Sequence, residues 1–326
     1  MSEQAKNNMQ LGFGMPAEAA EQIEDMPTAE EFRRLTAEEQ DSDFIAMESK
    51  TYMQDAWNRF RRNKLAMFGL IVVGIIVLLA IAGPILSSYT YEEFTANKNA
   101  MPSAQHLFGT DKFGRDIFTR IMYGARISLA VGFAAAMINL VIGIVYGGIA
   151  GYMGGKVDLF MMRIVDILYS IPTMLYVILI MLMFGANVVS IMIGICVANW
   201  VGMARIVRSQ VMSLKQQEFA MAAQVMGAST IRILLRHLIL NSMGPIIVTV
   251  TLMIPQAIFT EAFLSFVGVG ISAPQASWGM MAQNAKAVID TYPIQVIWPI
   301  AAICITMLSL NFVGEGLTEA LDPKKK

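Results

Sequence analysis

The sequence predicts an all-α membrane protein with six transmembrane helices. Hydrophobic residues fill 56% of the 326 positions, charged residues fill only 15%, and the mean hydropathy of +0.54 lies outside the ordinary range of soluble domains. Apolar runs of about twenty residues recur along the chain, and a run of that length crosses a bilayer as a helix because lipid offers the backbone no hydrogen-bond partners. Polar and basic segments separate these runs, as the loops of a multi-pass protein do.

The chain opens on an acidic segment, residues 1–50, that holds no apolar run. Because this segment has little to bury, we expect a disordered cytoplasmic tail rather than a cleaved signal peptide. Residues 51–64 differ, since Trp57 and Phe60 stand among arginines. Aromatic and basic side chains just before an apolar run are typical of an amphipathic elbow helix in the inner membrane interface, which places the amino terminus in the cytoplasm.

Six spans follow, one for each apolar run. We expect them at about residues 65–86, 125–152, 159–184, 188–204, 245–266 and 294–313. An extracytoplasmic loop, residues 87–123, separates the first span from a five-helix core at 124–320, and a second outer loop ends at Pro293. Six crossings place both termini and the long polar segment 205–241 in the cytoplasm, and the basic excess of that segment favours the same side.

Two acidic residues fall inside the predicted spans. Asp166 and Glu261 would each cost on the order of 2–3 kcal/mol at the centre of a membrane helix, so we expect them to face the bundle, water or an interface. Both are candidates for the transport pathway or its gate. The alternative for each is a structural hydrogen bond near the end of a span.

Glycines and prolines predict the packing of the spans. Four glycines of the second span form a stripe that permits close helix contact: Gly143, Gly147, Gly148 and Gly151. Kinks are expected at Pro172, Pro255 and Pro299.

The sequence offers little for catalysis. No GxxxxGK[ST] phosphate loop is present, so the chain is not expected to hydrolyse ATP alone. Both cysteines lie inside apolar runs, and only two histidines occur, which leaves no zinc spacing and no histidine cluster. We therefore expect no catalytic residue, no cofactor and no metal in this chain. Energy for transport would come from another subunit, or transport would be passive.

The polar segment 205–241 has a helical pattern of its own. Its small residues Ala220, Ala223 and Gly227 fall three and four apart, so they share one face of a short helix that is suited to close contact. Beside membrane spans, such a helix predicts a structured handle for a cytoplasmic partner. The alternative is an interfacial helix without a partner.

Several segments resemble one family. EFAMAAQVMGASTIRILLRHLILNSMGP, from Glu218, resembles the cytoplasmic coupling loop of ABC-importer permeases. HLFGTDKFGRDIFTRIMYGARISL, from His106, resembles the outer-loop signature of the dipeptide and oligopeptide (peptide/nickel) importer permeases of the second-permease type. WNRFRRNKLAMFGL, FTEAFLSFVGVGISAPQASWGMM and NFVGEGLTEALDP resemble the same family's elbow, fifth span and carboxy-terminal segment. The resemblance covers about residues 57–323 and implies the type I permease fold of ABC importers.

The coupling loop departs from the family pattern at two positions. Met221 stands where the pattern has glutamate, and Leu240 where it has proline. Glu218 lies three residues earlier on nearly the same helical face, so we assign the acidic role to it. The resemblance implies that an ATPase is contacted through Glu218, Met221, Ala222, Ala223, Gly227 and Ala228.

The resemblance also implies partners and a location. It implies a bacterial or archaeal cytoplasmic membrane, membrane lipid, a second permease, two ATPase subunits that bind ATP and magnesium, an extracytoplasmic substrate-binding protein, and no nucleic acid. Candidates for docking of the binding protein are Asp111, Arg115 and Asp116, with a salt bridge inside a folded loop as the alternative. Peptides are the expected substrate. Nickel or another small solute is the alternative within the family, and an ion-coupled secondary carrier is the alternative class.

Overall fold

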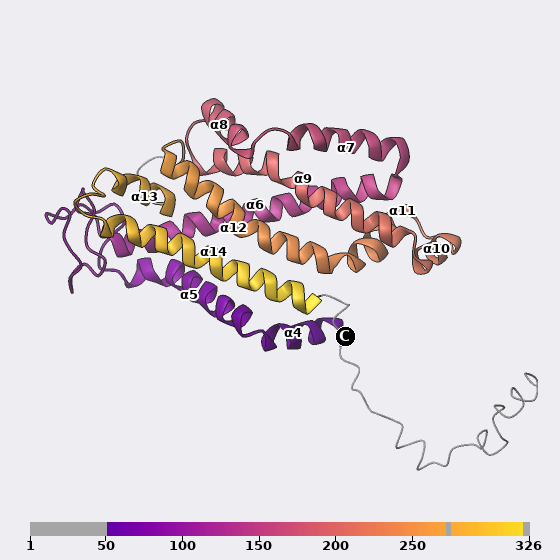
Figure 1. The fold of residues 1–326 in the computed structure, drawn as a ribbon, viewed down its shortest axis with the longest axis horizontal. Helices are drawn as coiled ribbons and strands as arrows, with labels where there is room; N and C mark the ends of the chain where they lie inside the picture. Colours follow the sequence, from indigo (N-terminus) through magenta and orange to yellow (C-terminus); the bar gives the residue numbers. More distant parts are fainter. Residues whose placement is uncertain (1–50, 272–274, 322–326) are drawn as a thin grey trace, which may run out of the picture. The chain divides into compact units, whose positions relative to one another are not determined.

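The computed structural model describes residues 51–271 and 275–321, which form a bundle of helices (Figure 1). The predicted acidic tail, residues 1–50, lies outside the described residues. In order, the elements are α4 (Tyr52–Arg62), α5 (Lys64–Leu86), α6 (Ile117–Met153), α7 (Gly155–Tyr169), α8 (Thr173–Phe184), α9 (Val188–Lys215), α10 (Glu218–Val225), α11 (Thr230–Arg232), the π-helical turn η1 (Ile233–Ile239), α12 (Met243–Val267), α13 (Trp278–Lys286) and α14 (Ile294–Leu321).

Five of the described helices are long and apolar enough to cross a membrane: α5, α6, α9, α12 and α14. A sixth crossing is available if α7 and α8 are counted together as one bent span. In the described ranges there is no strand, only an isolated bridge between Thr110 and Asp116. The prediction of an all-α membrane protein is confirmed.

The predicted third span, 159–184, is broken in the structure. Its two halves, α7 and α8, meet at 79°, with Ser170, Ile171 and Pro172 between them. Proline has no backbone N–H and its ring clashes with the preceding turn, so a helix stops before it and a new one starts after it. The expected kink at Pro172 is therefore a full break, whereas Pro255 and Pro299 lie inside the continuous helices α12 and α14.

The glycine stripe of α6 is a packing surface against α9. A Cβ atom at Gly147 would collide with the backbone of Ala204, and one at Gly151 with the backbone of Arg208 and the side chain of Val211. Gly148 differs, because a Cβ there would make only ordinary contact with Leu234, 3.6 Å away. The backbones of α6 and α9 are thus as close as two helices can be, which fixes one relative to the other.

The main core lies where α6, α9 and α12 meet, and it extends under α10 and η1. Its members include Ala136, Met203, Val207, Val211, Ala220, Ala223, Ile233, Leu238, Ile246 and Ile258. Helix α4 corresponds to the predicted elbow. Its Phe60 packs against Ala66 and Ala320, which ties the start of α5 to the end of α14.

Helix α9 continues well past the predicted end of the fourth span. It passes Ala204 without a break and ends only at Lys215, so the first part of the predicted cytoplasmic segment belongs to this helix. At the opposite end of the bundle, α6 already begins at Ile117, where Asp116 accepts a hydrogen bond from the backbone N–H of Thr119 (2.8 Å). Both helices therefore extend beyond the spans predicted from their apolar runs.

Candidate functional site

Helix α10 sits at the end of α9 and buries only one narrow face. Ala220 and Ala223 are each 3% exposed and pack into the core that includes Val211 and Ile233. Small side chains at these two positions let an eight-residue helix lie directly on α9 and η1. The rest of α10 faces outward.

The turn after α10 requires a glycine for its backbone conformation. Gly227 has φ +79°, in the left-handed region, and its N–H donates to the carbonyl of Gln224 (3.0 Å). The N–H of Ala228 donates to the carbonyl of Ala223 (3.1 Å). This pair of bonds is a Schellman motif, which ends the helix and reverses the chain toward η1. A Cβ atom at Gly227 would meet nothing within 4 Å, so space inside this chain does not demand glycine there.

Several large apolar side chains lie exposed on the outward side of this region, beside the polar Glu218 and Gln224. The exposed fractions are 88% for Val225, 80% for Met226 and 70% for Ile231, and Phe219, Met221 and Leu235 are also exposed. We call these six residues the apolar tip. They come from α10, the turn after it, α11 and η1. Large apolar side chains exposed together indicate a contact surface, because their exposure to water is unfavourable.

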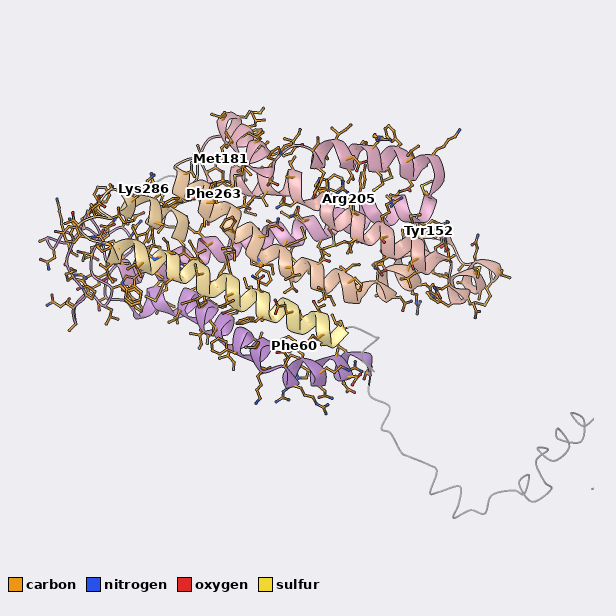
Figure 2. All side chains as sticks on the ribbon, viewed as in Figure 1. Phe60, Tyr152, Met181, Arg205, Phe263 and Lys286 are labelled. Atoms are coloured by element: carbon orange, nitrogen blue, oxygen red, sulfur yellow. The ribbon has the colours of Figure 1, made fainter. Side chains whose placement is uncertain are left out.

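Two ion pairs join α7 to α9. Arg205 Nη2 lies 2.9 Å from Asp166 Oδ1, and the Arg205 guanidinium lies over the ring of Tyr169. Arg208 donates through two nitrogens to both carboxylate oxygens of Asp158. Figure 2 shows Arg205 on α9 and Tyr152 at the end of α6. Asp166 thus matches the structural alternative, and its role in the pathway stays a prediction.

The other intramembrane carboxyl, Glu261, is completely buried in α12. Its two oxygens accept hydrogen bonds from the hydroxyls of Ser128 on α6 (3.1 Å) and Ser265 on α12 (2.9 Å). The Ser128 hydroxyl also accepts from the backbone N–H of Trp278 at the start of α13 (3.5 Å). Glu261 therefore connects α12, α6 and α13, which are neighbours in Figure 1.

In the loop before α6, the candidate docking residues bind one another or their neighbours. Asp111 accepts from the guanidinium of Arg115 (2.7 Å) and from two backbone N–H groups. Asp116 caps α6 and lies 2.9 Å from the Nδ1 of His106. Arg115 and Asp116 are buried, so these side chains stabilise the loop fold, as the alternative proposed, and their contact with a binding protein stays a prediction.

Comparison with known proteins assigns the family. The family model described as binding-protein-dependent transport system inner membrane component matches residues 140–326, more than half of the chain. The chain belongs to this family. A second model, the N-terminal TM domain of oligopeptide transport permease C, matches residues 51–104 of the permease, which hold α4 and α5.

The permease has curated relatives that align over almost its full length. It is 48% identical to the oligopeptide transport system permease protein OppC of Bacillus subtilis (strain 168) over 294 residues, which are 90% of this chain and 96% of that one. It is 47% identical to the dipeptide transport system permease protein DppC of the same strain over 286 residues, 87% of this chain and 89% of that one. A solved structure of the MetNI methionine ABC transporter covers 61% of this chain and 94% of its own, with a TM-score of 0.49 at 16% identity.

The predicted coupling residues of the permease divide between two faces. Glu218, Met221, Ala222 and Gly227 are exposed, and Ala228 is half-buried. Ala223 is buried against this chain's own core, so its side chain cannot reach a partner. Its side chain instead seats α10 on that core.

The sequence pattern left out most of the apolar tip. Phe219, Val225, Met226, Ile231 and Leu235 were not among the predicted coupling residues, yet all five are exposed there. A signal was present, because the apolar residues of this short helix are not confined to one face, although Glu218 and Gln224 lie among them. In a helix at the surface of a bundle, that pattern indicates a second apolar contact.

Proposed function

We propose that this permease is the transmembrane subunit of an ATP-driven importer of dipeptides or oligopeptides. The names of the OppC and DppC relatives support the substrate class, because each relative aligns with this chain over most of the length of both proteins. The observation that carries the coupling role is the apolar tip: six exposed apolar residues on and around α10, directly after the long helix α9.

The orientation follows from the basic residues. Arg61 and Arg62 end α4, and Arg232 and Arg236 lie exposed near α10. Positive residues favour the cytoplasmic side, so α4, α10 and both termini are assigned to the cytoplasm. The loop before α6, and α13, are then extracytoplasmic, where a substrate-binding protein delivers its cargo.

The mechanism needs partners that bring energy. An ATPase subunit receives the apolar tip in a groove, and the closure of two ATPases around ATP and magnesium moves α10. Since α9 runs unbroken from α10 into the bundle, that movement reaches the spans as a rigid-body displacement. This chain supplies no ATP site of its own to the cycle, and a second, similar permease completes the pathway.

Reconstitution of the full assembly tests the proposal. The permease would be co-expressed with a second permease and two ATPases from its gene neighbourhood, placed in liposomes, and supplied with the binding protein and a labelled tripeptide. We expect the binding protein to stimulate ATP hydrolysis and the peptide to accumulate inside.

Other results would redirect the assignment. Uptake of Ni²⁺ but of no peptide would exclude the proposed substrate class. Uptake that needs no ATP and follows an ion gradient would refute the importer and favour a secondary carrier.

A further inference from the structure

We propose that α7 is an arm latched to α9 by the Asp158–Arg208 and Asp166–Arg205 ion pairs, and that this latch couples α10 to the transport pathway. Asp158 and Asp166 act on transport through α9, so they are positioning residues. The inference rests on the proposed function, because it concerns how the movement of α10 is used. It starts from the unusual attachment of α7.

Besides the ion pairs, a small apolar contact that includes Met162 and Leu168 holds α7 in place. The hydroxyls of Tyr146 and Tyr176 also donate to carbonyls of α7. Of its residues only Asp158 and Val165 are buried. Val165 packs in a small cluster with Trp200, Val201 and Ala204 of α9. The neighbouring α8 is held differently, since Val177 and Met181 pack into a larger apolar cluster and the Val177 backbone lies against Gly194. Losing the ion pairs would therefore free α7 far more than α8.

Both ends of α7 are built as hinges. At its start, Gly154 and Gly155 have φ values of +65° and +54°, and a Cβ atom at either would meet nothing within 4 Å. Space does not require two glycines there, so their role is the backbone conformation and its freedom. At the far end the chain breaks by 79° before Pro172. An element between two such points can change its angle once the contacts along its length are loosened.

The latch also lies on the route from α10. Arg205 and Arg208 are on the last part of α9, which ends at Lys215, shortly before α10 begins. The glycine stripe fixes α9 to α6 along this part, so α7 is the adjacent element that remains able to move. A small displacement of α9 changes the geometry of both ion pairs at once.

The two ion pairs differ in strength. The side chains of Asp158 and Arg208 are 11% and 30% exposed and pair through two hydrogen bonds, whereas those of Asp166 and Arg205 are 54% and 38% exposed and pair through one. An ion pair that is shielded from water and joined by two hydrogen bonds is stronger than an exposed pair joined by one. The Asp158–Arg208 pair is therefore the principal fastening.

The test measures peptide uptake per ATP hydrolysed by the complete importer in liposomes. In Asp158→Asn we expect this ratio to fall roughly 5-fold or more, and hydrolysis without binding protein to rise, since an unlatched arm no longer restrains the cycle. Arg163→Gln is the matched control, because it removes a charge from an exposed position of the same helix. The double variant Asp158→Arg with Arg208→Asp restores the pair with reversed signs and should regain at least half of the lost ratio.

Each outcome decides the proposal. An unchanged ratio in Asp158→Asn, an equal fall in Arg163→Gln, or no recovery in the reversed pair would overturn the latch. If Asp158→Asn does not accumulate in the membrane, Asp166→Asn at its exposed position provides the same test, with a smaller fall expected. If the binding protein does not stimulate ATP hydrolysis by the wild-type complex, the proposed function and the latch both fail. If it does, but the ratio of uptake to hydrolysis does not change in Asp158→Asn, the latch alone fails.

Discussion

The turn at Gly227 yields a prediction that separates two roles of a glycine. A β-branched residue at φ +79° costs roughly 1–2 kcal/mol in backbone energy, while asparagine enters the left-handed region far more readily. Because no atom lies within 4 Å of the Cβ position, the chain adds no steric cost of its own. Gly227→Val should therefore lower the population of this turn relative to its alternatives by roughly 5- to 30-fold, and Gly227→Asn by much less.

The assay is peptide uptake by the reconstituted importer, normalised to the permease present in the liposomes. We expect uptake to fall in Gly227→Val and to be largely retained in Gly227→Asn. Gly74→Val is the control, since Gly74 also has an open Cβ position but lies within the helix α5 at an ordinary φ. If asparagine is as damaging as valine, the turn conformation is not the reason for glycine, and close approach by the ATPase becomes the explanation.

Three further predictions concern contact, burial and packing. Phe219→Glu should reduce co-purification of the ATPase by roughly 30-fold if Phe219 is a central contact, without loss of membrane insertion; an unchanged yield of ATPase would remove Phe219 from the interface. Glu261→Ala should destabilise the detergent-solubilised permease by about 1–3 kcal/mol, seen as a lower unfolding temperature, because the Ser128 and Ser265 hydroxyls lose their acceptor; Glu261→Gln should cost less, and equal losses would show that size rather than hydrogen bonding matters. Gly147→Val should overpack the α6–α9 contact at a cost of about 1–3 kcal/mol and so lower the unfolding temperature, whereas Gly148→Val should be tolerated. Equal effects of the two substitutions would contradict the described α6–α9 contact.

Hydropathy predicted the spans well because it averages over about twenty residues, but it cannot locate helix ends. Helix α9 continues past Ala204 with Val207 and Val211 buried in the core. Its Arg205 and Arg208 pair with acidic residues of α7 that are distant in sequence. The early start of α6 could have been predicted in principle, because aspartate is a preferred N-cap residue and Asp116 accepts from the backbone N–H three residues later. The size of the break at Pro172 was not readable, because proline signals a bend without its angle.

The candidate site was predicted only in part for a related reason. Periodicity showed that Ala220 and Ala223 share a face, but not whether that face meets this chain or a partner. The structure assigns both alanines to the chain's own core and leaves Val225 and Met226 exposed. Likewise, the sequence could not show that Arg115 donates a hydrogen bond to Asp111 within the loop, and the contact of these residues with a binding protein stays a prediction.

The length of α6 has a mechanical consequence. Its 37 residues span about 55 Å at 1.5 Å per residue, while the hydrocarbon layer of a bilayer is about 30 Å thick and the whole membrane about 40–45 Å. Even when tilted, α6 is longer than the membrane is thick, and it runs without a break from its N-cap Asp116 to the glycine pair that begins at Gly154. A displacement at the Asp116 end of α6 is therefore transmitted to the start of α7 by the stiffness of a single helix.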